Sequence, residues 1–211
     1  MKSIIEKDQK NKHSDHLLRL QSVMREKGDE LHAGKLSELL DKLGSDELYV
    51  AICGHFSAGK SSFINALCGK DYLPSGPIPA SANIVTIRGG EGSAKVTHHR
   101  DRAGGIKWVS VPFEHLHKYC LNGTDIASVE LNVPAPLLRE HRLVLLDTPG
   151  IDSTDERHQE ATSSALHLAD IVIYVVDYNH VESEINLSFA KKMRELGKPL
   201  YLLVNQIDKH R

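Results

Sequence analysis

The sequence has no long apolar segment. Among its 211 residues, the longest apolar run extends from Ile171 to Val176, whereas a helix that spans a membrane needs about 20 apolar residues. The N-terminus also lacks the apolar stretch of a secretory signal peptide. We therefore expect any contact of this chain with a membrane to be peripheral.

Cysteine and net charge are low as well. The three cysteines, Cys53, Cys68 and Cys120, show no CxxC spacing, and this predicts reduced thiols in a cytoplasmic protein. The formal net charge of -2 creates no field that would attract nucleic acid, so we expect no nucleic-acid partner. Thirteen histidines invite a metal interpretation, but adjacent His98 and His99 would face opposite sides of a strand, and His115 and His117 are two apart on an expected helix. No cysteine joins them at ligand spacing. The chemistry of the protein must come from other motifs.

The first part of the chain is polar and then helical in pattern. Charged and polar residues dominate positions 1–13, for which we expect a flexible segment. Apolar residues at helical spacing then predict amphipathic helices over 14–27 and 35–43, separated at Gly28 and Gly34. Their apolar stripes could pack on the chain's own domain or against helices that lie outside this chain.

From residue 48 onward, short apolar segments alternate with helical stretches. The runs 143–146, 171–176 and 200–204 are apolar at nearly every position, which is typical of parallel strands covered on both faces. We therefore predict an α/β fold with a mostly parallel sheet flanked by helices over 47–211, preceded by the N-terminal amphipathic helices. The expected strands are 48–53, 83–88, 94–98, 107–111, 126–133, 142–147, 170–177 and 199–204, and the expected helices are 60–68, 112–121, 157–168 and 183–196.

A glycine-rich stretch, GHFSAGKSS at residues 54–62, follows the first expected strand. It matches the P-loop pattern, in which successive backbone N–H groups and a helix N-terminus surround one phosphate anion. Lys60 can reach the β- and γ-phosphate oxygens, which gives it a catalytic role, and Ser61 can place its hydroxyl on Mg²⁺. We assign nucleotide binding to Gly54, Ser57, Ala58, Gly59, Lys60, Ser61 and Ser62.

The sequence Asp147-Thr148-Pro149-Gly150 follows another apolar strand. By itself it could be an ordinary Pro-Gly turn. At a strand end beside a P-loop, however, the Asp147 carboxylate can hold Mg²⁺ through water, and the Gly150 N–H can approach the γ-phosphate. We expect a metal ligand at Asp147 and a nucleotide contact at Gly150.

The strand at 199–204 ends in Asn205-Gln206-Ile207-Asp208. This looks like the Asn-Lys-x-Asp base-reading motif of GTPases, with Gln206 where lysine is usual. A carboxylate at Asp208 would accept both guanine donors, N1–H and the 2-amino group, and would be left unpaired by adenine. Asn205 would tie this loop to the P-loop, and the stem of Gln206 could lie on the purine. An ATPase or kinase is therefore disfavoured.

The three motifs in this order resemble the GTPase superfamily, and their details resemble the dynamin superfamily and its bacterial dynamin-like branch. GHFSAGKSSFINALCG is similar to that family's P-loop, PIPASA at 77–82 to its first switch, and LVLLDTPGIDS at 143–153 to its second. The helices within 14–46 occupy the position of the family's neck. The resemblance covers about residues 15–211 and implies GTP and GDP as ligands and Mg²⁺ as cofactor.

The resemblance also implies how hydrolysis is activated. Ser81 is the best match to the switch threonine that closes on Mg²⁺, and we assign it metal and catalytic roles. Ile151, directly after DTPG, cannot orient water as glutamine does in many small GTPases. The family instead forms a dimer across the nucleotide face, where a P-loop serine and a bound K⁺ or Na⁺ replace an arginine finger. Ser57 matches that serine.

These features lead to ranked hypotheses about function. The first is a mechanochemical GTPase of the dynamin type, acting in membrane fusion, fission or repair at the inner face of the cell membrane. The second is a soluble regulatory or assembly GTPase with no membrane role. The third is a truncated interaction module that does not hydrolyse nucleotide.

The third hypothesis is motivated by the position of the last residue, Arg211, three residues after Asp208. GTPases of this class have a further strand and base-pocket loop, and dynamin relatives have a stalk and a lipid-contacting tip. We therefore expect a C-terminally incomplete GTPase domain that binds GTP weakly, with impaired hydrolysis, and that contacts lipid only through regions outside this chain.

Overall fold

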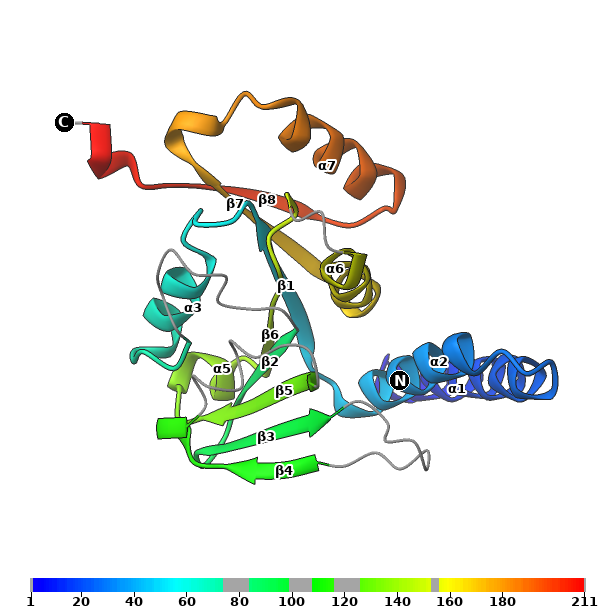
Figure 1. Cartoon of the computed structure of the whole chain (residues 1–211). Helices are drawn as coiled ribbons and strands as arrows, with labels where there is room; N and C mark the ends of the chain where they lie inside the picture. The colour runs from blue at the N-terminus through cyan, green and yellow to red at the C-terminus, as the bar shows by residue number, and fades with distance from the viewer. Residues whose placement is uncertain (1, 74–83, 99–107, 116–125, 153–155, 211) are drawn as a thin grey trace. The chain divides into compact units, whose positions relative to one another are not determined.

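A computed structural model of the chain describes residues 2–73, 84–98, 108–115, 126–152 and 156–210 (Figure 1). It divides into two compact units, residues 1–47 and residues 48–211. No helix in this described part of the chain combines the length and the apolar character needed to cross a membrane.

The first unit is a pair of helices, α1 (Lys2–Glu26) and α2 (Glu30–Ser45). The turn between them uses Gly28 at a φ of 74°, and the Asp29 side chain accepts the His32 backbone N–H to cap α2. The buried Gln21 side chain fastens the pair, because its Nε2 donates to the Ala33 carbonyl at 3.2 Å and to the Ser37 hydroxyl at 2.7 Å.

Two expectations for this unit differ from the structure. Helix α1 includes residues 2–13, for which the sequence predicted a flexible segment, and α2 continues through Gly34, where the sequence predicted a break. The first segment contains no proline or glycine, and its lysine, glutamate and glutamine residues favour the helix. A single glycine inside a helix costs only about 1 kcal/mol, which neighbouring helical residues offset at Gly34.

The second unit is built on an eight-stranded sheet in the order β4-β3-β5-β2-β6-β1-β7-β8. Strand β1 pairs in parallel with β6 and β7, β7 with β8, and β2 with β5. The β2–β6, β3–β4 and β3–β5 pairs are antiparallel. The strands are β1 (Leu48–Gly54), β2 (Val85–Gly89), β3 (Ser93–His98), β4 (Trp108–Val111), β5 (Ile126–Val133), β6 (Leu143–Asp147), β7 (Ile171–Asp177) and β8 (Leu200–Asn205).

Helices cover the two faces of this sheet (Figure 1). Alternate residues of β1 point to opposite faces, so that Ile52 joins the core beneath α3 and α5, and Ala51 joins the core beneath α6 and α7. The helices are α3 (Lys60–Cys68), α5 (Pro136–Glu140), α6 (Glu156–Leu168) and α7 (Glu184–Glu195), with 3₁₀ turns at η1 (Phe113–His115), η2 (Tyr178–His180) and η3 (Ile207–His210). The predicted α/β fold, with its helix-flanked sheet, is confirmed.

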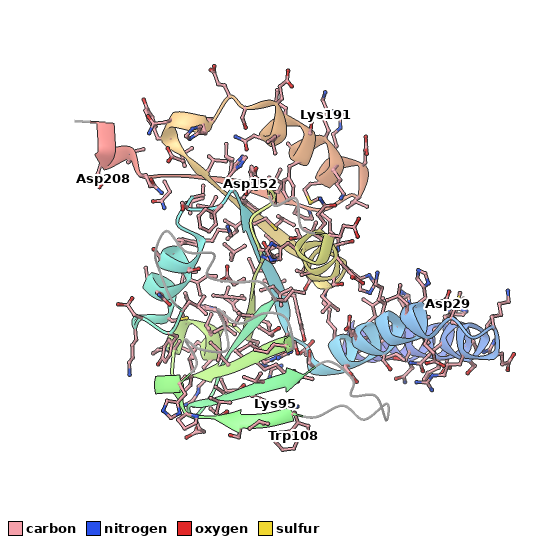
Figure 2. The ribbon with its side chains drawn as sticks, viewed as in Figure 1. Asp29, Lys95, Trp108, Asp152, Lys191 and Asp208 are labelled. Atoms are coloured by element: carbon pink, nitrogen blue, oxygen red, sulfur yellow. The ribbon has the colours of Figure 1, made fainter. Side chains whose placement is uncertain are left out.

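Several local expectations were wrong. The run 200–204 was expected to be covered on both faces, but in β8 Tyr201 is 62% and Leu202 57% exposed, because β8 is the last strand at one side of the described sheet. On β4, the last strand at the other side, Trp108 is 61% exposed, with the Lys95 ammonium 5.1 Å from its ring centroid (Figure 2). The sequence also missed the short helix α5. Of the helix expected at 112–121, residues 113–115 form a 3₁₀ turn and 116–121 lie outside the described residues.

Candidate nucleotide-binding site

The P-loop at residues 54–62 joins the end of β1 to the start of α3, as the motif requires. Gly54 and Gly59 have φ angles of 149° and 96°, a region that side chains rarely adopt. A Cβ atom on Gly54 would lie 2.1 Å from the Val175 carbonyl oxygen, and one on Gly59 would lie 2.2 Å from the Asn205 amide nitrogen. Both glycines therefore allow a backbone conformation that other residues rarely adopt, and they also leave room for Val175 and Asn205 to lie close to the loop.

Lys60 is buried at the centre of this loop. Its Nζ donates to the carbonyl of Gly54 at 3.1 Å and to that of His55 at 2.8 Å. Burial lowers the pKa of the Lys60 ammonium, and the nearby Asp147 and Asp152 carboxylates act in the opposite direction. The loop thus contains a buried ammonium group that can pair with a phosphate through charge-assisted hydrogen bonds.

Asp147, at the end of β6, lies beside the start of α3. The Ser61 hydroxyl donates to its Oδ2 at 3.3 Å, and its Oδ1 has no hydrogen-bond partner among the described residues although the side chain is only 1% exposed. Burial raises the pKa of Asp147 to about 6, opposed by the Lys60 charge and the Ser61 hydrogen bond. A buried carboxylate with an unused oxygen beside a hydroxyl is a donor set that suits a hard divalent cation. No group of three or more His, Cys, Asp or Glu side chains in the described ranges could hold a metal on its own.

The residues that follow Asp147 dock onto the P-loop. The Thr148 hydroxyl donates to the Ile52 carbonyl at 2.9 Å, and the Ile151 N–H donates to the Gly54 carbonyl at 3.2 Å. A Cβ on Gly150 would lie 3.0 Å from the nitrogen of Phe56. Gly150 therefore allows this second loop to approach the P-loop closely.

The loop after β8 contacts the P-loop from another side. Asn205 Nδ2 donates to the Ala58 carbonyl at 2.9 Å, and Gln206 Nε2 donates to the Ser57 carbonyl at 2.6 Å. Asp208 lies exposed on η3, the C-terminal turn (Figure 2). The tie expected between Asn205 and the P-loop is present, whereas Gln206 contacts the backbone at Ser57, a role that sequence reasoning did not assign.

The structure thus brings most of the predicted site residues to one edge of the sheet. Ser62 is an exposed residue of α3, and Ser81 lies outside the described residues. The residues that meet at the P-loop, through the contacts above or by belonging to it, are Gly54, Ser57, Ala58, Gly59, Lys60, Ser61, Asp147, Gly150, Asn205 and Gln206.

Sequence reasoning missed the roles of three residues, His55 within the P-loop and Asp152 and Asn186, which contact it. Asp152 Oδ1 accepts the Phe56 N–H at 2.9 Å, and the His55 ring lies 2.7 Å from Asn186 of α7. His55 occupies a variable position of the P-loop pattern, and Asn186 is 131 residues distant from it in sequence. Asp152 lies two residues after the DTPG sequence, and this nearness was a signal that it could belong to the site. The motif itself assigns it no role.

Comparisons with known proteins agree with this geometry. The profile of the Dynamin family matches residues 50–208. Dynamin-like protein A of Bacillus subtilis is 41% identical over 185 residues, covering 88% of this chain and 15% of that protein. Human Mitofusin-2 is 27% identical over 212 residues, covering 98% of this chain and 27% of that protein.

A solved structure described as an oligomerised bacterial dynamin pair has the same fold. It superposes with a TM-score of 0.62 at 24% identity, covering 84% of this chain and 28% of that one. The chain therefore spans less than a third of the length of each of these three relatives.

Proposed function

This chain belongs to the dynamin family as a GTPase domain, and we propose that it is the mechanochemical domain of a dynamin-like protein, dimerising across its nucleotide face to drive membrane fusion, fission or repair. The observation that carries the nucleotide part is the meeting of three loops at the ends of β1, β6 and β8, with a buried cation among them. The membrane part rests on the family alone. Lipid contact, at the inner face of the cell membrane, would come from regions outside this chain.

The phosphates of GTP would occupy the P-loop. Backbone N–H groups of the loop and the N-terminus of α3 supply positive ends of dipoles, and Lys60 supplies the charge. In the structure the ammonium of Lys60 is held only by carbonyls of its own loop, among the contacts that the described residues make. It can exchange these for phosphate oxygens with stronger, charge-assisted hydrogen bonds.

Ser61 and Asp147 are the residues that would hold Mg²⁺. The unpartnered Oδ1 of Asp147 and its costly burial support this role, because a cation would remove both penalties. When bound, the metal would supply neutralisation of charge on the β- and γ-phosphates. Gly150 would bring its N–H to the γ-phosphate, and Ser81 would add a switch hydroxyl.

Guanine selection would depend on Asp208. Its carboxylate can accept two parallel hydrogen bonds from the guanine edge, and adenine offers no matching pair of donors. The bonds from Asn205 and Gln206 to the P-loop would hold the base-reading loop at a fixed distance from the phosphates. The base and phosphate sites would then act as one rigid unit.

Activation of hydrolysis would depend on the dimer. Ile151 has no polar group to orient the attacking water, so another group must supply the missing stabilisation. Ser57, exposed at the rim of the P-loop, would bind K⁺ or Na⁺ beside the β- and γ-phosphates when a second copy covers the site. The solved structure that shares this fold is described as an oligomerised bacterial dynamin pair, which supports assembly as part of the proposal.

Two measurements test the proposal. Competition of GTP and ATP for a fluorescent guanine nucleotide should favour GTP by at least about a hundredfold, because the Asp208 carboxylate would accept both guanine donors and adenine would leave it unpaired. Specific GTPase activity should rise steeply with protein concentration and with K⁺. Flat specific activity would instead support a soluble regulatory GTPase, and binding without turnover would support an interaction module.

A further inference from the structure

His55, the second residue of the P-loop, is connected to α7 by a buried hydrogen-bond network. Its ring Nε2 lies 2.7 Å from the Oδ1 atom of Asn186, and the Tyr174 hydroxyl donates to the same oxygen at 2.7 Å. Asn186 is 7% and Tyr174 1% exposed. We propose that His55 and Asn186 are positioning residues that hold the P-loop in its phosphate-binding form, an inference that rests on the proposed nucleotide binding.

The orientation of the Asn186 amide follows from its other partners. Its Nδ2 donates to the carbonyls of His180 at 2.7 Å and Val181 at 3.0 Å. A carbonyl only accepts hydrogen bonds, so the nitrogen of the amide must face these two groups and the oxygen must face His55. The Asn186 amide thus uses both of its N–H donors, and its oxygen accepts two hydrogen bonds.

The same argument determines which ring nitrogen of His55 carries a hydrogen. Because Asn186 Oδ1 only accepts, the His55 Nε2 must donate. The Tyr174 hydroxyl is a second donor to that oxygen and does not compete for the ring. His55 therefore has a defined orientation that a side chain without a donor at this position would lose.

The orientation of His55 affects groups that contact the phosphates. Its backbone carbonyl accepts the Lys60 ammonium at 2.8 Å, and its Nδ1 lies 3.8 Å from Asp152 Oδ2. The other oxygen of Asp152 accepts the N–H of the next residue, Phe56, at 2.9 Å. Two consecutive residues of the P-loop are thus attached, one through its side chain to α7 and one through its backbone to the DTPG loop.

This arrangement extends from the P-loop to the turn before α7. Asn186 is anchored by the N–H bond it donates to the Ser183 hydroxyl at 3.3 Å, and its side chain holds the η2 end at His180. Loss of the His55 bond would leave the buried Oδ1 with one partner and would free the ring to rotate. The expected result is a looser P-loop, and the fold itself should remain.

Three substitutions separate positioning from general stability. His55→Leu removes the donor, whereas His55→Gln keeps an amide donor of similar reach. Tyr174→Phe is the matched control, because it removes a bond of the same length to the same oxygen without changing the P-loop. All three are compared with the unchanged chain in titrations with fluorescent GDP, in GTPase assays that give kcat and KM, and in amide hydrogen exchange without nucleotide.

We expect His55→Leu to weaken GDP binding by about tenfold, the factor that corresponds to one buried hydrogen bond, and to raise KM more than it lowers kcat. His55→Gln should recover most of the affinity. Tyr174→Phe should lower the melting temperature and keep the affinity. Amide exchange at residues 54–60 should increase in His55→Leu and remain unchanged in Tyr174→Phe.

Two results would overturn the inference: equal weakening of binding by His55→Leu and Tyr174→Phe, or unchanged exchange of the P-loop amides in His55→Leu. Failure of the unchanged chain to prefer guanine nucleotides would overturn the proposed function instead. The exchange measurement needs no nucleotide and still decides whether His55 orders the loop.

Discussion

The side chain of Gln206 donates a hydrogen bond of 2.6 Å to the backbone carbonyl of Ser57. Both residues have left-handed backbones, with φ angles of 60° and 61°, which is uncommon for residues other than glycine. The bond joins the base-reading loop to the P-loop at the residue that we propose to bind the activating cation. A neutral amide thus provides a tether at the position where the motif usually has lysine.

Removal of this tether should weaken nucleotide binding. In Gln206→Ala the Ser57 carbonyl loses this donor while the Asn205 bond to the Ala58 carbonyl stays, so we expect the Kd for GDP to rise by about three- to tenfold. Gln206→Lys keeps a donor and should bind GDP within about threefold of the unchanged chain. Fluorescent GDP titration measures both, and an unchanged Kd in Gln206→Ala would contradict the tether.

Gly59→Ala should abolish nucleotide binding. The new Cβ would lie 2.2 Å from the Asn205 amide nitrogen, which would have to move and release the Ala58 carbonyl. Gly197→Ala is a matched control, because Gly197 also has a positive φ, of 63°, but has nothing within 4 Å of a Cβ. The control should cost about 1 kcal/mol of unfolding free energy by urea denaturation and leave binding unchanged. Comparable affinity losses in the two variants would exclude the proposed clash.

Burial of Asp147 should make the metal-free protein less stable at neutral pH. Its pKa is about 6 in the fold, above the ordinary value of 3.8 for an aspartate carboxyl, so between these values the folded protein binds more protons than the unfolded chain. The free energy of unfolding should therefore fall as pH rises from about 4 to about 6, by up to about 3 kcal/mol from this group. Urea denaturation at a series of pH values, in the presence of a metal chelator, measures this decrease in the free energy of unfolding.

In Asp147→Asn this component of the pH dependence should disappear, because the amide does not titrate. The variant should also lose the stabilisation that Mg²⁺ with GDP gives to the unchanged chain. The same slope with pH in both proteins would mean that Asp147 is not the group responsible.

Ser57→Ala tests the proposed cation site. Stimulation of GTP hydrolysis by K⁺ should be lost, while the Kd for GDP should stay within about threefold, because the Ser57 backbone carbonyl still accepts the Gln206 bond. Steady-state rates in K⁺, in Na⁺ and in choline provide the comparison. Persistent stimulation by K⁺ in the variant would assign the activating cation to other ligands.

The sequence alone determined the features that depend on neighbouring residues. The strand, the curled loop and the helix around Lys60 follow from an apolar run, spaced glycines and helix-forming residues within a short stretch. Strands β1, β6 and β7 were predictable because burial on both faces leaves a continuous apolar pattern. The family also follows from these local motifs and their order.

Only the tertiary structure decided which distant side chains meet and which strands remain uncovered. Asn186 reaches His55 because α7 packs beside the end of β1, and no local pattern encodes a pair 131 residues apart. The exposure of Tyr201 and Trp108 depends on the places of β8 and β4 at the two sides of the sheet, which their own apolar composition does not reveal. The order of the strands in the sheet is set by packing between elements. The apolar pattern of a single strand indicates only which of its side chains can be buried.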